Sequence, residues 1–377
     1  MLLALSSDQE FVRETTERFL VEKAPPNEVR RLQGDSAGFD ADYWRRGAEL
    51  GWTSFLVGEA HGGGTISGAG LVDLSLVAYE FGRHAAPGPL VPTNIVAGAL
   101  SAHDAQTDVI ADLLAGTGIA TWCAPELRSF HGSWTPTVEI RRDGADVVVL
   151  GTVSPVEAAG QAGHLLVTGR DGDGITQVLV AASTAGVSIE PLRTADLTRR
   201  FGAVTFDDVR LSQDAIVGAP GEASTDVDLQ FHRTLAILNA EAVGAMQAAF
   251  DMTVEWAFDR YAFGRPLASY QALKHRFADM LTWLEASHAI SDAASWAIEE
   301  GSPDAAELAS AAKAFIGQYG AEVVQDCVQL HGGIGVTFEH NLHLFLRRFT
   351  VNRALAGTPA EHRQRIGAIL DGRGVAA

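Results

Sequence analysis

Two short segments in the last third of the chain carry residues that could hold a phosphate-bearing ligand. Arg260 opens the first segment, and Gly332 and Gly333 lie in the second, after Gln329. An arginine side chain presents a planar fork that can donate two hydrogen bonds to phosphate oxygens. Glycine lets the backbone approach a ligand where a Cβ would collide. Taken singly, Arg260 could equally be a charge at a helix end, and the glycines a plain helix stop.

The two segments are more specific together. Residues 260–280 and 329–335 resemble the two C-terminal signatures of the acyl-CoA dehydrogenases, flavoenzymes that introduce a double bond next to a thioester carbonyl. The resemblance implies that FAD lies extended between subunits, with its flavin against one subunit's β domain and its pyrophosphate and adenine at a neighbour's helix bundle. It also implies cofactor-binding roles for Arg260 at the pyrophosphate, Phe263 as an apolar wall, Gln271 and Gln329 near the adenosine and diphosphate, and Gly332 and Gly333 at a close backbone approach.

The catalytic base is where this sequence departs from the family. Most members carry a Glu directly before a Gly-Thr pair, and here Ala356 precedes Gly357 and Thr358. Some relatives carry the Glu on the first long helix of the C-terminal bundle, and that position is Thr234 here. The backbone N–H of Ala356 could still polarise a thioester carbonyl. Neither side chain can take a proton at neutral pH, and losing a positioned base typically costs about 10²–10⁴-fold in rate.

Glu241 is the nearest carboxylate along that helix. Small residues flank it, so it could be buried and poised as a weak candidate base. A buried carboxylate is more often structural than catalytic. We expect Glu241 to bond a neighbouring helix.

The flavin side of the expected site is also altered. Residues 123–127 align only through Pro125 with the family's Thr-Glu-Pro-Gly-x-Gly-Ser segment, and residues 151–158 replace its Gly-x-Lys-x-Phe-Ile segment. Residues 196–209 still resemble the end of the family's β domain. The flavin-side half therefore resembles the family less than the adenine-side half does.

This asymmetry resembles one subunit type of the actinobacterial steroid-degrading acyl-CoA dehydrogenases, which form α₂β₂ heterotetramers. The resemblance implies FAD-dependent α,β-desaturation of an acyl-CoA, with steroid side-chain thioesters as a candidate substrate class, a homologous base-bearing subunit as partner, and electron-transfer flavoprotein as acceptor. A basic set with few lysines (Lys23, Lys274 and Lys313) fits a high-GC genome. Two alternatives stay open: an active homotetramer that uses Glu241, and a non-catalytic structural partner. A flavin oxidase or monooxygenase would need the flavin contacts that are altered here.

The composition limits the other classes of function. A length of 377 residues predicts two or three domains, and 47% hydrophobic with 20% charged residues is typical of a globular protein. The net charge of −19 argues against nonspecific nucleic-acid binding. Cys123 and Cys327 make no disulfide framework, which favours a cytoplasmic protein. No apolar run is long enough to predict a membrane span or a signal peptide, and no metal site is expected.

The expected fold class is α+β and multidomain, in the order of the acyl-CoA dehydrogenase fold. Residues 1–117 should form an N-terminal helical domain, residues 118–220 a middle β-sandwich or barrel, and residues 221–377 an antiparallel helix bundle. Ser7 and Glu10 form a capping-box pattern at the first helix, with Phe11, Phe19 and Leu20 near one face. Further helices are predicted at about 40–51, 70–83, 104–115, from about 224, 268–299, 303–330, 339–355 and 360–371.

Overall fold

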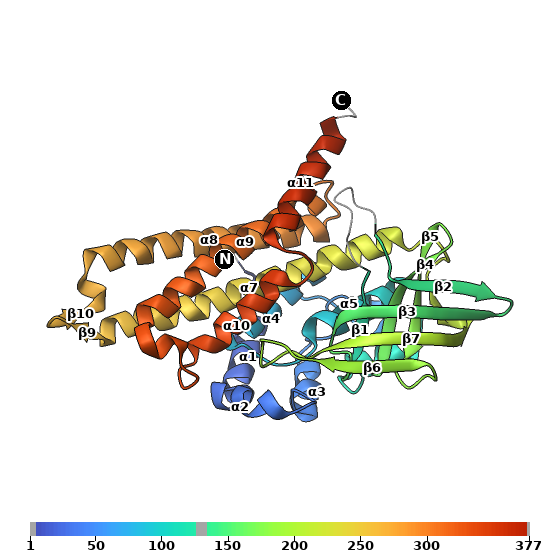
Figure 1. Cartoon of the computed structure of the whole chain (residues 1–377), viewed down its shortest axis with the longest axis horizontal. Coiled ribbons are helices and arrows are strands. Elements are labelled where there is room, and N and C mark those ends of the chain that lie inside the picture. The colour runs from blue at the N-terminus through green and yellow to red at the C-terminus, as the bar shows by residue number, and fades with distance from the viewer. Residues whose placement is uncertain (1–4, 126–133, 375–377) are drawn as a thin grey trace.

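The computed structural model describes residues 5–125 and 134–374. The strand-rich region follows the N-terminal helices along the chain and lies at one end of the molecule, and the long C-terminal helices extend to the opposite end (Figure 1). The N-terminal helices are α1 (Ser7–Lys23), α2 (Pro26–Arg31), α3 (Ala41–Glu49), α4 (Gly70–His84), α5 (Leu90–Ala102) and α6 (Thr107–Leu114). The strands are β1 (Ala120–Cys123), β2 (Val138–Asp143), β3 (Asp146–Glu157), β4 (His164–Asp171), β5 (Gly174–Ala181), β6 (Val187–Leu192), β7 (Phe201–Ser212) and β8 (Ile216–Val217). The C-terminal helices are α7 (Ser224–Asp259), α8 (Gln271–Glu299), α9 (Ala305–His331), α10 (Leu342–Ala354) and α11 (Pro359–Gly374), and the hairpin β9 (Tyr261–Ala262) and β10 (Arg265–Pro266) joins α7 to α8.

The capping box of α1 lies one residue earlier than predicted. Ser6 is the N-cap, its hydroxyl accepts a hydrogen bond from the Gln9 backbone N–H at 3.2 Å, and the Gln9 side chain accepts from the Ser6 N–H. Ser7 and Glu10 are already inside the helix. Gln9 satisfies the reciprocal bond as well as a glutamate would, which explains the shifted boundary. Phe11 is exposed, and the buried face carries Phe19 and Leu20 instead.

The sequence predicts no helix between residues 83 and 104, where Pro87, Pro89 and Pro92 suggest a break, and helix α5 corrects this prediction. The helix begins at Leu90, directly after Pro89, and contains Pro92 in its first turn. The first four N–H groups of a helix have no intrahelical partner, so a proline there removes no hydrogen bond. Nearly every residue of α5 is buried. The helix therefore lacks the separate apolar and polar faces from which an amphipathic helix is predicted.

The strands form one sheet that curls around its own core. The order is β6-β7-β3-β2-β4-β5-β8, with β1 added in parallel to β4. Three strands lie between β5 and β7 in this order, yet Val178 on β5 and Val204 on β7 belong to the same core cluster. Successive residues of a strand point to opposite faces. On β4, Leu165 packs in this sheet core and Leu166 in the core of the N-terminal helices. The sheet is thus anchored to the helices through its outer face.

The long helix α7 crosses α4 at a pair of reciprocal glycines. A Cβ on Gly82 would lie 1.9 Å from the carbonyl oxygen of Glu241, and a Cβ on Gly244 would lie 1.9 Å from that of Tyr79. Only glycine permits this approach at both positions. The crossing fixes the height of Glu241 and Thr234 on α7 relative to the N-terminal helices. In the described part of the chain, no helix combines the length and apolarity that crossing a bilayer requires.

Candidate active site

A cavity of about 920 Å³ lies where the sheet meets the two helical regions. Ile95 on α5, Trp122 on β1 and Val153 on β3 form part of its wall. Thr234 from α7 and Ala356 from the segment between α10 and α11 complete it. The two positions at which the sequence analysis looks for a catalytic glutamate therefore face one cavity, and neither carries a carboxylate.

The backbone at Ala356 has an unusual conformation. Ala356 has a φ of +55° and Gly357 a φ of +102°. The Nε2 of His362 donates to the Ala356 carbonyl oxygen at 2.8 Å, and burial lowers the pKa of His362 to about 4, so the ring is neutral at pH 7. A Cβ on Gly357 would lie 2.9 Å from that same Nε2. The Ala356 N–H has no hydrogen-bond partner among the described residues, so it is free to act as a donor.

The titratable groups that line the cavity are already engaged. Arg199 donates to both carboxylate oxygens of Glu157, at 2.9 and 2.8 Å, while burial raises the pKa of Glu157. Glu361 caps α11: its carboxylate accepts from the backbone N–H and the hydroxyl of Thr358, and these bonds lower its pKa. A carboxylate with a lowered pKa, and one whose two oxygens both accept from an arginine Nη1, are both poor general bases.

Glu241 lies in a buried ion-pair cluster and does not line the cavity. Its two oxygens accept from Arg199 and Arg348. Arg348 also donates from Nε to Asp196 at 2.7 Å and from Nη2 to the carbonyl oxygen of Ala86 at 2.7 Å. The Arg348 pKa is raised well above its usual range by these carboxylates, which outweigh its desolvation. The placement favours a structural role for Glu241, tying α7 to α10 and to the loop before β7.

The predicted cofactor segments meet at the opposite end of the bundle, around Trp256 on α7. The Arg260 guanidinium lies 5.9 Å from the centre of the Trp256 ring. That ring stacks on His331 at 5.2 Å and 16°, and Gly332 follows with a φ of +64°. Arg260 is exposed and makes no ion pair with another described residue. Apart from the adjoining residues, no described atom lies within 4 Å of a Cβ built on Gly332 or on Gly333. An unpaired guanidinium beside an open glycine turn fits a phosphate group.

The hairpin between α7 and α8 presents Phe263 to solvent. Phe263 is 99% exposed and has a φ of +50°, and Gly264 follows with a φ of +81°. Gln271 opens α8 at the base of the hairpin, and Gln329 lies near the end of α9; both side chains are exposed. The exposed ring is therefore available to contact a ligand or a partner chain.

Within one chain these two sets of residues do not meet. The residues around Trp256 lie at the hairpin end of the bundle, whereas the cavity lies at the sheet end (Figure 1). A single extended cofactor that touched both kinds of surface would have to join two chains, as the sequence analysis expects.

Three features of the site were missed from the sequence. His362, Trp256 and Glu157 had no role in the sequence interpretation. Thr152 and Pro155, in the segment 151–158 that departs from the family's sequence, line the cavity. Cys123 is buried on β1, and burial raises the pKa of its thiol. Glu126 and Leu127, the end of the other altered segment, lie outside the described residues.

Two family models match the chain: "Acyl-CoA dehydrogenase, N-terminal domain" over residues 6–115, and "Acyl-CoA dehydrogenase, C-terminal domain" over residues 227–370. The sequence is similar to acyl-CoA dehydrogenase IpdE2 of Mycolicibacterium smegmatis, at 28% identity over 97% of this chain and 99% of the relative. It is also similar to IpdE2 of Mycobacterium tuberculosis, at 28% identity over 95% of this chain and 96% of the relative.

Among solved structures, a variant of the steroid ACAD Tcur3481-Tcur3483 is similar with a TM-score of 0.87, at 27% identity over 98% of this chain and 99% of that one. A glutaryl-CoA dehydrogenase from Mycobacterium smegmatis in complex with FADH2 shares the fold, with a TM-score of 0.86 at 20% identity over 98% of this chain and 95% of that one. Matched in both helical regions and across the whole fold, the chain belongs to the acyl-CoA dehydrogenase family.

Proposed function

We propose that this chain is the base-lacking subunit of a heteromeric, FAD-dependent acyl-CoA dehydrogenase, and that a homologous subunit supplies the catalytic carboxylate. The observation that carries the proposal is the cavity shared by Thr234 and Ala356, which lacks a carboxylate at both positions from which the family acts. The carboxylates that do line it, Glu157 and Glu361, are held by Arg199 and by Thr358.

In the proposed reaction a carboxylate of the partner subunit would remove the proton α to the thioester, and bound FAD would supply the hydride acceptor for the β-hydrogen. This chain's own residues would bind and orient the substrate and the cofactor. The free N–H of Ala356 would be available to a thioester carbonyl oxygen in this chain's own cavity. The neutral His362 donates to the Ala356 carbonyl oxygen and so holds the peptide that follows Ala356. A backbone N–H donor of this kind stabilises the negative charge that develops on a thioester carbonyl oxygen.

FAD would bridge two chains in this proposal. Arg260 and the turn at Gly332 and Gly333 would hold the pyrophosphate, and Phe263 would cover the nucleotide. These residues are exposed in the single chain, as a shared site requires. The neighbouring chain's cavity end would receive the flavin.

The substrate class proposed is a steroid-derived acyl-CoA thioester, and the electron acceptor an electron-transfer flavoprotein. The steroid class rests on the likeness to a steroid ACAD at 27% identity. The acceptor rests on the family alone.

The test is to purify the chain alone and together with the homologous dehydrogenase subunit, and to measure flavin absorbance per protein and turnover of acyl-CoA. The expected result is little FAD in the chain alone and a yellow, active complex with the partner. Full FAD content and normal turnover by the chain alone would contradict the proposal.

A further inference from the structure

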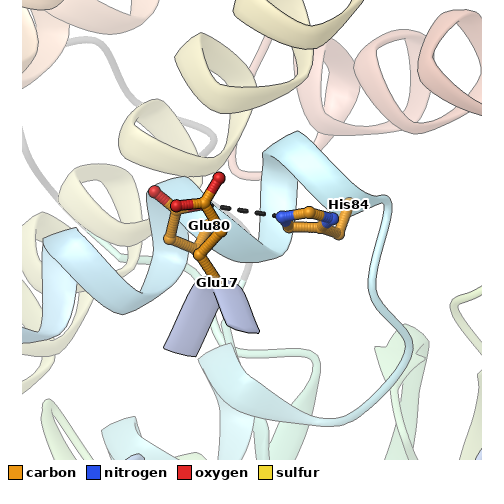
Figure 2. A group of neighbouring side chains, drawn as sticks. All are labelled: Glu17, Glu80 and His84. Carbon is orange, nitrogen blue, oxygen red and sulfur yellow. Dashed lines mark ion pairs between the residues drawn. The ribbon is translucent and has the colours of Figure 1, made fainter. Parts of the chain in front are cut away.

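A group of three potential metal ligands lies on the contact between α1 and α4, away from the cavity and from the Trp256 region. Glu17 comes from α1, and Glu80 and His84 come from α4, with one ligand atom of each lying within 4.8 Å of the others (Figure 2). Glu80 and His84 are four residues apart, so they share one face of the helix. None of the three lines the cavity.

Glu80 is the unusual member of the group. Its side chain is 1% exposed, and its Oε2 atom is buried without a hydrogen-bond partner among the described residues. The Nε2 atom of His84 is buried and unpartnered in the same way. These two atoms face each other at 3.7 Å, which is too long for a hydrogen bond. A buried carboxylate oxygen without a hydrogen bond is costly, so the arrangement favours a cation between the two atoms.

The nearest arginine does not supply that cation. Arg83 follows Glu80 on α4, but its guanidinium points to Asp251, at 3.5 Å, and to Glu17, at 4.0 Å. The contact with Glu17 is long and leaves that carboxylate able to coordinate a second cation. Figure 2 shows the dashed pair between Glu80 and His84, with Glu17 approaching from the other helix.

We propose that Glu17, Glu80 and His84 bind one divalent transition-metal ion of the zinc class, with water completing the coordination. Metal–ligand bonds of about 2.0–2.1 Å place two ligands of a tetrahedral ion about 3.4 Å apart, close to the observed 3.7 Å between Glu80 and His84. Two carboxylates and one neutral imidazole match the charge of such an ion. The imidazole favours zinc-like ions over Mg²⁺ and Ca²⁺, which take oxygen ligands.

The ion would act as a structural clamp. It would join α1 to the C-terminal end of α4, two residues before Ala86, whose carbonyl oxygen accepts from Arg348. Metal binding to the folded chain alone stabilises the fold by mass action. The site would thus support the buried cluster around Glu241 without taking part in the reaction.

The test uses the full chain, stripped with a chelator and then titrated with Co²⁺ as a spectroscopic probe and with Zn²⁺ as a competitor. The expected result is one Co²⁺ per chain with visible d–d absorption, loss of that absorption on adding Zn²⁺, and a melting temperature that rises with bound metal. The ligand variants are His84→Ala and Glu17→Gln, which leave buried Glu80 in place. The matched control is His103→Ala, which removes a histidine that pairs with Asp226 at 2.9 Å elsewhere.

Loss of at least tenfold in Co²⁺ affinity in His84→Ala, with wild-type affinity in His103→Ala, would support the site. Three results would overturn it. The wild-type chain could bind no Co²⁺ beyond the control level, His84→Ala could bind as wild type, or chelator and metal could leave the melting temperature unchanged while His84→Ala alone lowers it. The last result would identify a simple ion pair between His84 and Glu80.

Discussion

Thr234 and Ala356 are far apart in the sequence but face the same cavity. Thr234 lies on α7, the first helix of the bundle, and Ala356 follows α10, the fourth. The hydroxyl of Thr234 donates to the carbonyl oxygen of Gln230 at 2.8 Å, so it is satisfied within its own helix. The two positions at which the sequence analysis looks for a base therefore face the same cavity. Because both are unfilled here, restoring either one tests what the cavity can do.

The first prediction concerns Ala356→Glu. A glutamate there would place a carboxylate in the cavity without changing the backbone requirement, since Ala356 already holds a positive φ. In the FAD-loaded complex, we expect acyl-CoA to bleach additional flavin under anaerobic conditions, with a gain of about 10²-fold or more in rate at that site. Ala354→Glu is the control, because it adds the same charge at the exposed rim of the cavity. Equal bleaching in both variants would mean that this cavity does not hold a flavin.

The second prediction concerns Glu241→Gln. The change removes the charge that faces Arg199 and Arg348, and leaves two buried guanidinium groups under-compensated. Breaking a buried pair in this way costs about 3–5 kcal/mol, so we expect a large loss in the free energy of unfolding, measured by urea denaturation. Glu139→Gln on the sheet surface, whose pair with Arg141 is exposed, should cost less than about 1 kcal/mol. A stable but inactive Glu241→Gln variant would instead identify Glu241 as a base.

The cluster around Glu241 shows why part of the site escaped sequence reasoning. The family and the fold were predicted correctly, because the spacing within residues 260–280 and 329–335 is local information. Arg348, in contrast, bonds to residues 86, 196 and 241, which are far apart in the sequence. No local sequence pattern predicts that these residues lie together. The role of His362 could have been predicted from the sequence, because His362 lies in the first turn of α11, shortly after Ala356. Its ring faces the turn before the helix.

The errors in secondary structure have similar causes. The start of α1 was misplaced because Ser6 and Ser7 are both of a residue type that caps helices. Only Ser6 is followed three residues later by Gln9, whose side chain closes the capping box. Helix α5 was missed because three prolines suggested a break, and burial on all sides removed the helical period. The division of the chain at residues 117 and 220 remains a proposal, although α6 ends at Leu114 and α7 begins at Ser224.

The third prediction concerns Arg260→Ala in the complex with the partner subunit. If Arg260 holds a phosphate, we expect the FAD content to fall at least tenfold, measured by flavin absorbance per protein. The free energy of unfolding should change by less than about 1 kcal/mol, because the Arg260 side chain is exposed and its contact is a single cation–π pair with the half-buried Trp256. Arg210→Ala removes another exposed arginine, on β7, and should keep its FAD. Full FAD retention in Arg260→Ala would contradict the assigned role.

The fourth prediction concerns Lys313, which is buried on α9 and donates to the carbonyl oxygen of Asn352. Burial lowers its pKa from 10.5 to about 7, and the nearby charge of Arg199 acts in the same direction. The folded state then binds fewer protons than the unfolded state between about pH 7 and 10.5, so Lys313 makes stability rise with pH in that window. One proton corresponds to a slope of about 1.4 kcal/mol per pH unit.

Urea denaturation at several pH values between about 7 and 10 checks this slope, in wild type and in Lys313→Met. The methionine variant should lose the contribution, so its stability relative to wild type should fall steadily as the pH rises. Lys274→Met, at an exposed position on α8, should track the wild type at every pH. If Lys313→Met and wild type run parallel, Lys313 keeps its proton in the folded chain, and Glu241 in the neighbouring cluster must then balance a third buried cation beside Arg199 and Arg348.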